Sequence, residues 1–249
     1  MPDYSPLAWG LIALSTYITG ISKGGFAGGF GSLSVPLMAL AIGPLEAAGL
    51  LLPLLIAMDA LSLKAWWGQQ VMAEVRRLVP AAFVGIVIGT LLVDHLDENL
   101  IRLMLGSVAV LFALYMLFKP RVARQPGPLW ATICGGVGGF TSFLAHAGGP
   151  PINLYLLPKQ LPKPAFIATC VVTFAAINAM KLIPFVWLGE IDTSSLKVSL
   201  LLIPVAWFGV KSGLWLQSRV NEKAFYRLII ICMAILGAQL IWRGLGGQA

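Results

Sequence analysis

Charged residues are scarce in this chain. Asp, Glu, Lys and Arg together make up 11% of its 249 residues, whereas soluble domains carry about 25%. Apolar runs instead follow one another from residue 7 to residue 242, with short polar breaks between them. A soluble helical protein with a large core would need polar helix faces, which these runs lack. Their length and spacing predict an all-α integral membrane protein.

Residues and motifs typical of soluble catalytic sites are also few. The three cysteines have no CxxC spacing and there are only two histidines, so we expect neither a metal site nor a cofactor. No GxxxxGK[ST] motif is present, so we do not expect ATP hydrolysis. The net charge is +7, but the basic residues lie mainly in short loops and not in a stripe interleaved with aromatics. This pattern indicates cytoplasmic loops rather than a nucleic-acid surface.

The chain resembles itself at a distance of about half its length. The stretches "LVPAAFVGIVIG" and "LIPVAWFGVKSG" align without a gap at an offset of 124 residues. Both contain a GxxxG motif, which allows helix backbones to approach closely in lipid. The matched positions are Pro80 with Pro204, Gly85 with Gly209, and Gly89 with Gly213. We therefore interpret residues 1–249 as one membrane domain made of two repeats, 1–122 and 123–249.

Each repeat contains five apolar segments, and together they predict 8–10 membrane segments. A broken or re-entrant helix pair comes first in each repeat, followed by three transmembrane helices. The segments are 7–22, 28–42, 45–67, 76–94 and 100–118 in the first repeat, and 128–145, 149–158, 164–188, 196–216 and 224–242 in the second.

Equivalent loops of the two repeats carry opposite charges. Arg76 and Arg77 lie in the third loop of the first repeat, where the second repeat has Glu190 and Asp192. By the positive-inside rule, the repeats are inserted in opposite orientations and both termini lie outside the cytoplasm. Inverted repeats of this kind are typical of secondary transporters.

Glycine pairs interrupt the first apolar segment pair of each repeat. In "HAGGPPINLY" the pair Gly148–Gly149 ends one helix, and the two prolines that follow suit the first turn of the next. In "GGFAGGFGSLSVPLM" Ser32 or Ser34 can cap the new helix. The second return arm, residues 149–158, is too short to cross a bilayer. Re-entrant half-helices are therefore favoured, although the first pair could also span fully and return.

Two helix N-termini at membrane depth would carry partial positive charge and free amides, so we expect two anion-binding cradles that face each other. The alternative is that the glycine pairs serve only helix packing. Lys23, next to the first pair, would add cationic charge, or would reach to a lipid headgroup.

A few other polar residues lie inside the apolar segments. Asp59 is near the middle of the third segment, with Asn178 as its repeat counterpart. A buried carboxylate at this depth carries a proton or pairs with a cation such as Lys64 or Lys181. His146 either carries protons or is a hydrogen-bonded structural group. Trp66, Trp67 and Trp187 match an interfacial aromatic belt.

On these motifs the whole chain resembles the TauE/SafE sulfite exporter family, also called the 4-toluene sulfonate uptake permease family. The most distinctive stretch is "FTSFLAHAGGPPINLYLLPKQLPK"; the first motif reads "GFAGGFG" where "GIGGG" is commoner. The resemblance implies transport of sulfite or organosulfonates such as sulfoacetate, coupling to protons, and a bacterial inner membrane. It places the family's glycine motifs at Gly24, Gly25, Gly28, Gly29, Gly148 and Gly149.

We expect a secondary active transporter that is not an enzyme, with a small anion and the lipid bilayer as partners and a homodimer permitted. An integral membrane enzyme acting on a lipid pyrophosphate, or an anion channel, is the alternative. Asp59 and His146 are the candidates for the coupled proton. The expected substrate-binding residues are Lys23, Gly24, Gly25, Gly28, Gly29, Ser32, Ser142, His146, Gly148, Gly149 and Asn153.

Overall fold

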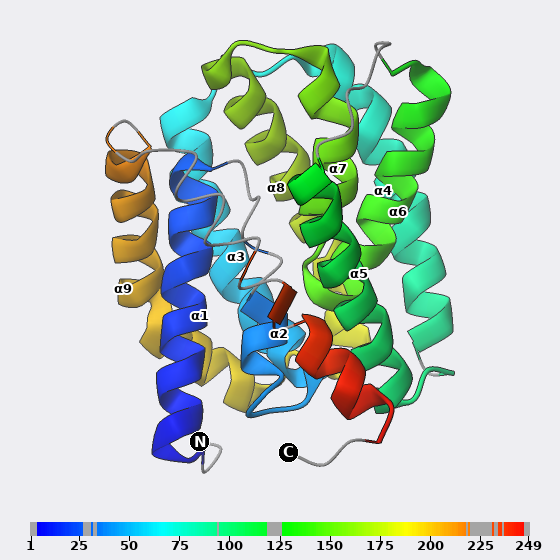
Figure 1. Ribbon diagram of the computed structural model, residues 1–249. Coiled ribbons are helices and arrows are strands. Elements are labelled where there is room, and N and C mark those ends of the chain that lie inside the picture. The colour runs from blue at the N-terminus through cyan, green and yellow to red at the C-terminus, as the bar shows by residue number, and fades with distance from the viewer. Residues whose placement is uncertain are drawn as a thin grey trace.

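The computed structural model describes residues 4–26, 31, 34–93, 95–118, 126–217, 219, 231, 234–235 and 237–246. Within these ranges the chain is helical and contains no strand (Figure 1). The helical elements are α1 (Pro6–Gly25), α2 (Ser34–Met38), α3 (Pro44–Trp66), α4 (Met72–Val93), α5 (Glu98–Phe118), α6 (Pro128–Ala145), α7 (Gly149–Leu156), the 3-10 turn η2 (Leu157–Lys159), α8 (Lys163–Trp187) and α9 (Thr193–Leu216).

Five of the described helices are long and apolar enough to cross a membrane: α3, α4, α6, α8 and α9. Local sequence fixes several of their ends. Proline lies in the first turn of α1, α3 and α6, where its missing amide hydrogen costs nothing. Asp192 caps α9 through a capping box with Ser195. The all-α membrane fold expected from the sequence is thereby confirmed.

Both predicted helix breaks are present. The first helix of the chain, α1, ends at Gly25, and α2 begins at Ser34. The second break lies at His146, which adopts a left-handed conformation with φ of 51° directly after α6. Helix α7 has eight residues, a length of about 12 Å, so it cannot cross a hydrocarbon core of about 30 Å.

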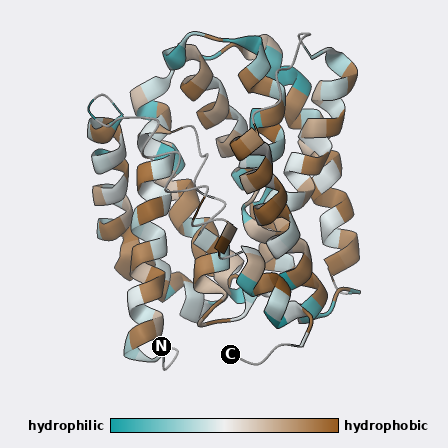
Figure 2. Ribbon diagram, viewed as in Figure 1, coloured by the Kyte–Doolittle hydropathy of each residue, from teal (hydrophilic) through white to brown (hydrophobic). Residues whose placement is uncertain are grey.

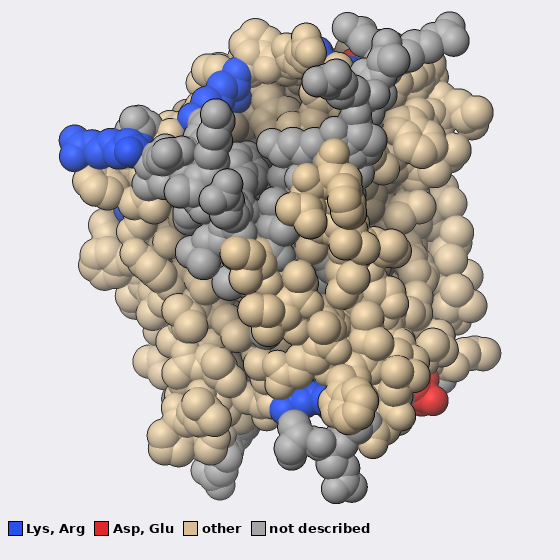
Figure 3. Space-filling view, viewed as in Figure 1, with Lys and Arg blue, Asp and Glu red and all other residues tan. Residues whose placement is uncertain are grey.

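The two broken pairs enter the bundle from opposite ends. The pair α1–α2 begins and returns at the end that holds both termini, while α6–α7 begins and returns at the other end (Figure 1). Hydrophilic residues gather toward these ends (Figure 2). The described atoms in the middle of the face seen in Figure 3 are mostly uncharged.

Each broken pair packs on the other half of the chain. The main neighbours are α9 for α1 and α4 for α6, while α3 and α8 lie against each other between them. Glycines make these contacts close. A Cβ atom added at Gly85 would lie 1.9 Å from the Gly136 carbonyl oxygen, and one at Gly213 would lie 2.2 Å from that of Ile21. The GxxxG glycines therefore serve helix packing, as the sequence predicted.

Candidate functional site

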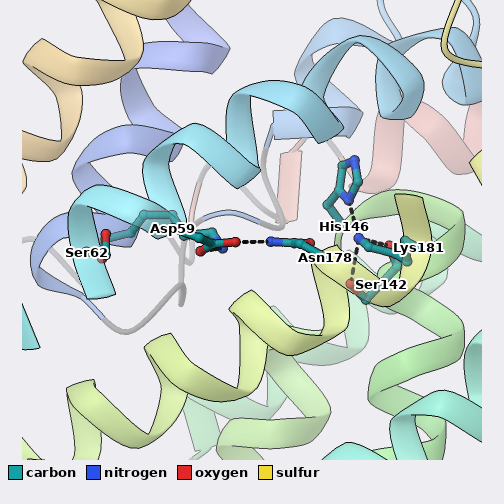
Figure 4. Close-up of polar contacts among 7 residues, drawn as sticks. Asp59, Ser62, Ser142, His146, Asn178 and Lys181 are labelled. Atoms are coloured by element: carbon teal, nitrogen blue, oxygen red, sulfur yellow. Dashed lines mark hydrogen bonds and ion pairs between the residues drawn. The ribbon is translucent and has the colours of Figure 1, made fainter. Parts of the chain in front are cut away.

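A buried ion pair joins the end of α1 to α3. The Lys23 ammonium group donates to Asp59, and the two side chains are 7% and 5% exposed. Asn178 of α8 donates from Nδ2 to the second carboxylate oxygen of Asp59 at 2.6 Å (Figure 4). Both carboxylate oxygens are thus bonded, as a buried charge requires. Asp59 was expected to pair with Lys64 or Lys181 if its role were structural, and its partner is instead Lys23.

A second buried lysine lies beside this ion pair. Lys181 of α8 is fully buried and donates to the backbone oxygen of Ser142 at 2.9 Å and to its hydroxyl oxygen at 3.0 Å. Its third contact is Nδ1 of His146, so Lys181 lies between His146 and Ser142 (Figure 4). Among the described residues, no carboxylate forms an ion pair with Lys181.

The hydrogen bonds of His146 define which ring nitrogen carries the proton. Nε2 lies 2.8 Å from the carbonyl oxygen of Ala48, and a carbonyl can only accept, so Nε2 is protonated. Nδ1 is then the acceptor for Lys181. In this arrangement His146 is neutral, because a proton on Nδ1 would require Lys181 to stop donating to it.

Four of these residues, Lys23, Ser142, His146 and Asn178, line a small cavity of about 20 Å³, which has room for about one water molecule. Asp59 and Asn178 fix its depth. Asp59 lies 15 residues after Pro44, the first residue of α3, and Asn178 lies 15 residues after Lys163, the first residue of α8. The two helices start from opposite ends of the bundle (Figure 1). At 1.5 Å per residue each is about 22 Å from its own end, close to the bilayer centre. The described lining residues are Lys23, Gly31, Leu55, Ser142, His146, Gly149, Phe174 and Asn178.

Four of the residues expected to bind substrate therefore line the cavity: Lys23, Ser142, His146 and Gly149. Lys23 is buried and does not extend to a headgroup. Three other expected residues, Gly28, Gly29 and Ser32, lie outside the described residues.

Gly24 and Gly25 face α9. A Cβ atom at Gly24 would lie 2.3 Å from the Val210 carbonyl oxygen, and one at Gly25 would lie 2.2 Å from that of Gly213. Their contacts match the packing alternative. Trp66 also differs from expectation: it is buried, and its indole nitrogen donates to the Gly24 carbonyl oxygen at 3.0 Å. It thereby satisfies a backbone acceptor at the end of α1 and is not a belt residue.

The N-terminus of α7 presents fewer amides than a typical helix start. Pro150 and Pro151 have no amide hydrogen, and Ile152 donates to the carbonyl oxygen of Gly148. This end can therefore offer only the amides of Gly148 and Gly149. Asn153 faces α8 instead of the cavity, and its Oδ1 accepts from Cys170 Sγ at 3.8 Å.

Lys181 is a buried residue beside the cavity that the sequence suggested only as an ion-pair partner of Asp59. The signal that could have found it is the repeat. The offset of 119 residues that relates Asp59 to Asn178 also relates Lys23 to Ser142, Leu55 to Phe174, and Ser62 to Lys181. The Ser62 hydroxyl donates to the backbone oxygen of Lys23 at 3.2 Å, just as Lys181 donates to the backbone oxygen of Ser142.

The far end of α7 is tied to α4. Tyr155 is fully buried, and its hydroxyl donates to the Glu74 carboxylate in the first turn of α4. Lys159 of η2 lies 3.0 Å from the same carboxylate, and Arg77 lies 3.2 Å from it. Two basic side chains and a hydroxyl thus surround one carboxylate, which holds the return arm against α4.

A multi-pass helical bundle with a charged cavity at mid-membrane, between two broken helices, defines the architecture of a membrane transport protein. The comparisons agree. The chain belongs to the sulfite exporter TauE/SafE family, whose profile matches residues 12–240.

The chain is also 23% identical to the probable membrane transporter protein YfcA of Escherichia coli K12, over 98% of this chain and 93% of that protein. The YfcA proteins of the O6:H1 and O157:H7 strains of Escherichia coli match to the same extent. No solved structure matches the chain at a significant level. The chain is therefore a multi-pass membrane transporter protein.

Proposed function

We propose that this chain is a secondary active transporter of small sulfur-containing anions, such as sulfite or organosulfonates, coupled to protons. The observation that carries the proposal is the complete burial of Lys181 without a carboxylate partner among the described residues. An ammonium group buried at mid-membrane is costly, and among the described residues none supplies a carboxylate for it. Its charge is balanced when an anion enters the adjacent cavity, where Lys23, Ser142 and the amide of Gly149 are further donors.

The size of the cavity supports a carrier over an open channel. At about 20 Å³ the cavity is narrower than a sulfonate group needs, so its walls must separate for the anion to enter. Lys181 already uses all three of its hydrogens on Ser142 and His146. An arriving oxygen atom therefore replaces one of these bonds, and binding changes the contact between α6 and α8.

Two inverted repeats, 1–122 and 123–249, would supply the two alternating conformations. Support comes from the reciprocal packing of α1 on α9 and of α6 on α4. Two of the residue pairs 119 positions apart, Lys23 with Ser142 and Leu55 with Phe174, also line one cavity. We further propose a bacterial inner membrane, with both termini outside the cytoplasm. Arg76 and Arg77 lie in the second turn of α4, and this helix begins at the end of the bundle away from the termini (Figure 1).

Asp59 and His146 remain the candidates for carrying the coupled proton. In the described arrangement each is occupied: Asp59 by Lys23 and Asn178, and His146 by Lys181 and Ala48. Protonation of either one therefore requires Lys23 or Lys181 to move away. This links the uptake of a proton to the rearrangement of the lysines around the anion.

The experiment is uptake of sulfite into proteoliposomes, with proton flux followed by an internal pH dye. We expect sulfite-dependent proton flux in the wild type, its loss in Lys181→Met, and its retention in Lys197→Met, where the exposed lysine lies outside the cavity. Sulfite-dependent flux that survives Lys181→Met would remove the proposed site. Saturation of uptake with sulfite separates a carrier from an anion channel.

The enzyme alternative has less support. Lipid pyrophosphate hydrolysis needs paired carboxylates or a comparable catalytic group at the helix breaks, and the described residues 22–26 and 145–149 include no carboxylate. We therefore propose that the chain is not an enzyme. Release of phosphate from a lipid pyrophosphate by the purified protein would contradict this. A homodimer stays a proposal, to be tested by the mass of the purified complex in detergent.

A further inference from the structure

The charge of the cavity defines which anions it can hold. Three ionisable side chains with less than a tenth of their surface exposed lie at the cavity. Lys23 lines it, whereas Asp59 and Lys181 are hydrogen-bonded to the lining residues Asn178 and Ser142. Lys23 and Asp59 form an ion pair and cancel, whereas Lys181 bonds only to neutral groups. With the amine of Lys181 protonated, two positive charges and one negative charge leave a net charge of +1 in the described site.

The neighbouring polar groups do not change this sum. His146 is neutral, because Nε2 donates to Ala48 and Nδ1 accepts from Lys181. Asn178 contributes an amide and Ser142 a hydroxyl, neither of which carries charge. The remaining described lining residues are glycine, leucine and phenylalanine.

We propose that the site selects anions that carry a single negative charge. This rests on the proposed function and narrows its substrate class: hydrogensulfite is preferred to the sulfite dianion, and a singly charged alkanesulfonate is preferred to sulfoacetate with both of its acid groups ionised. A monoanion neutralises the site. A dianion leaves one negative charge uncompensated at the bilayer centre, and a zwitterion such as taurine leaves the positive charge uncompensated.

Binding of methanesulfonate and methylphosphonate to the purified protein in detergent tests this directly. The two have the same tetrahedral shape, but well above its second pKa, which lies slightly above neutral pH, the phosphonate carries two charges, so binding is compared at alkaline pH. We expect methanesulfonate to bind at least about tenfold more tightly than methylphosphonate, and also more tightly than sulfate, because an uncompensated buried charge is a strong basis for discrimination. Equal or tighter binding of the dianions by the wild type would overturn the inference. Binding of none of these anions, nor of sulfite, would instead overturn the proposed function.

Two variants separate charge from shape. Asp59→Asn raises the net charge of the site to +2, so the preference for methanesulfonate over sulfate should shrink or reverse. The double variant Lys23→Met/Asp59→Asn keeps a net charge of +1 through Lys181, so it should bind more weakly, having lost the Lys23 donor, but should still prefer methanesulfonate to sulfate. Lys197→Met is the control for a lost lysine outside the cavity. An unchanged preference in Asp59→Asn would overturn the inference, and the wild-type comparison decides it even if that variant does not fold.

Discussion

Lys23 and Asp59 depend on each other, because each is a buried charge whose main partner is the other. Removing one member of a buried ion pair typically costs about 3–5 kcal/mol, whereas replacing both with uncharged groups is often close to neutral. The cost arises from the charge that stays behind without a partner. When Lys23 is replaced, Asn178 stays bonded to the Asp59 carboxylate, but a neutral amide cannot balance the charge of that carboxylate.

We therefore expect Lys23→Met and Asp59→Asn each to lower the thermal unfolding midpoint strongly, and the double variant to recover most of the loss. The measurement is thermal unfolding of the three purified variants in detergent. If the two single effects simply add in the double variant, the pair is not energetically coupled.

Glu190 lies in the loop between α8 and α9, outside the membrane-spanning helices. Burial, together with the nearby carboxylate of Glu46, raises its pKa above the ordinary value. A carboxyl group with a raised pKa in the folded state favours folding at acidic pH, and this contribution is lost as the pH rises through the folded-state pKa. Glu190→Gln should therefore raise the unfolding midpoint at neutral pH, by an amount that shrinks as the pH falls toward the ordinary carboxyl pKa. A midpoint difference that grows on acidification would contradict this.

At the scale of elements, glycine positions decide how closely α4 and α6 approach. A Cβ atom at Gly139 would lie 2.0 Å from the Ala82 carbonyl oxygen, whereas one at Gly136 would meet its nearest neighbour at 3.7 Å. The two glycines lie three residues apart on the same helix, so they form a matched pair.

Gly139→Ala should lower stability by about 1–3 kcal/mol through overpacking. Gly136→Ala should be neutral or should stabilise the helix by up to about 1 kcal/mol. Thermal unfolding of both variants in the same detergent measures the difference. Equal effects would mean that helix propensity, and not the α4–α6 contact, determines the outcome.

The elements themselves could largely be predicted, because apolar runs, glycine pairs and prolines act locally. The predicted second break at Gly148–Gly149 and the observed start of α7 coincide for this reason. Which face a glycine presents depends on the neighbouring helix, and no local pattern contains that information. The packing of Gly24 and Gly25 on α9 could thus not be predicted from the sequence, and an anion contact by their amides stays a prediction.

The site was predicted in part for the same reason. Lys23 and His146 stand next to the breaks, so their position in the sequence pointed to the cavity. Lys181 lies inside a long apolar helix, six residues before its end, where a single lysine suggests an ion pair. Only the fold shows that Lys23 takes the carboxylate and leaves Lys181 with neutral partners.

At the scale of the whole molecule, the arrangement predicts which loops face the cytoplasm. Two single cysteines can be introduced into a variant without its native cysteines, one at Gln69 in the loop before α4 and one at His95 in the loop after α4. Both positions are exposed, and they lie at opposite ends of α4. A membrane-impermeant thiol reagent added to intact cells should label His95→Cys and leave Gln69→Cys unlabelled until the cells are lysed. The opposite labelling would reverse the proposed orientation.

The contact of Tyr155 and Lys159 with Glu74 has a consequence for how the return arm can move. It clamps one end of α7, so any tilt of this short helix pivots near residues 155–159, and the displacement grows toward Gly149. Over a lever about 12 Å long, a tilt of about 10° shifts the Gly149 end by about 2 Å. Small rotations of α7 about this fixed end are therefore enough to change the width of the cavity beside Gly149, while residues 155–159 stay in place.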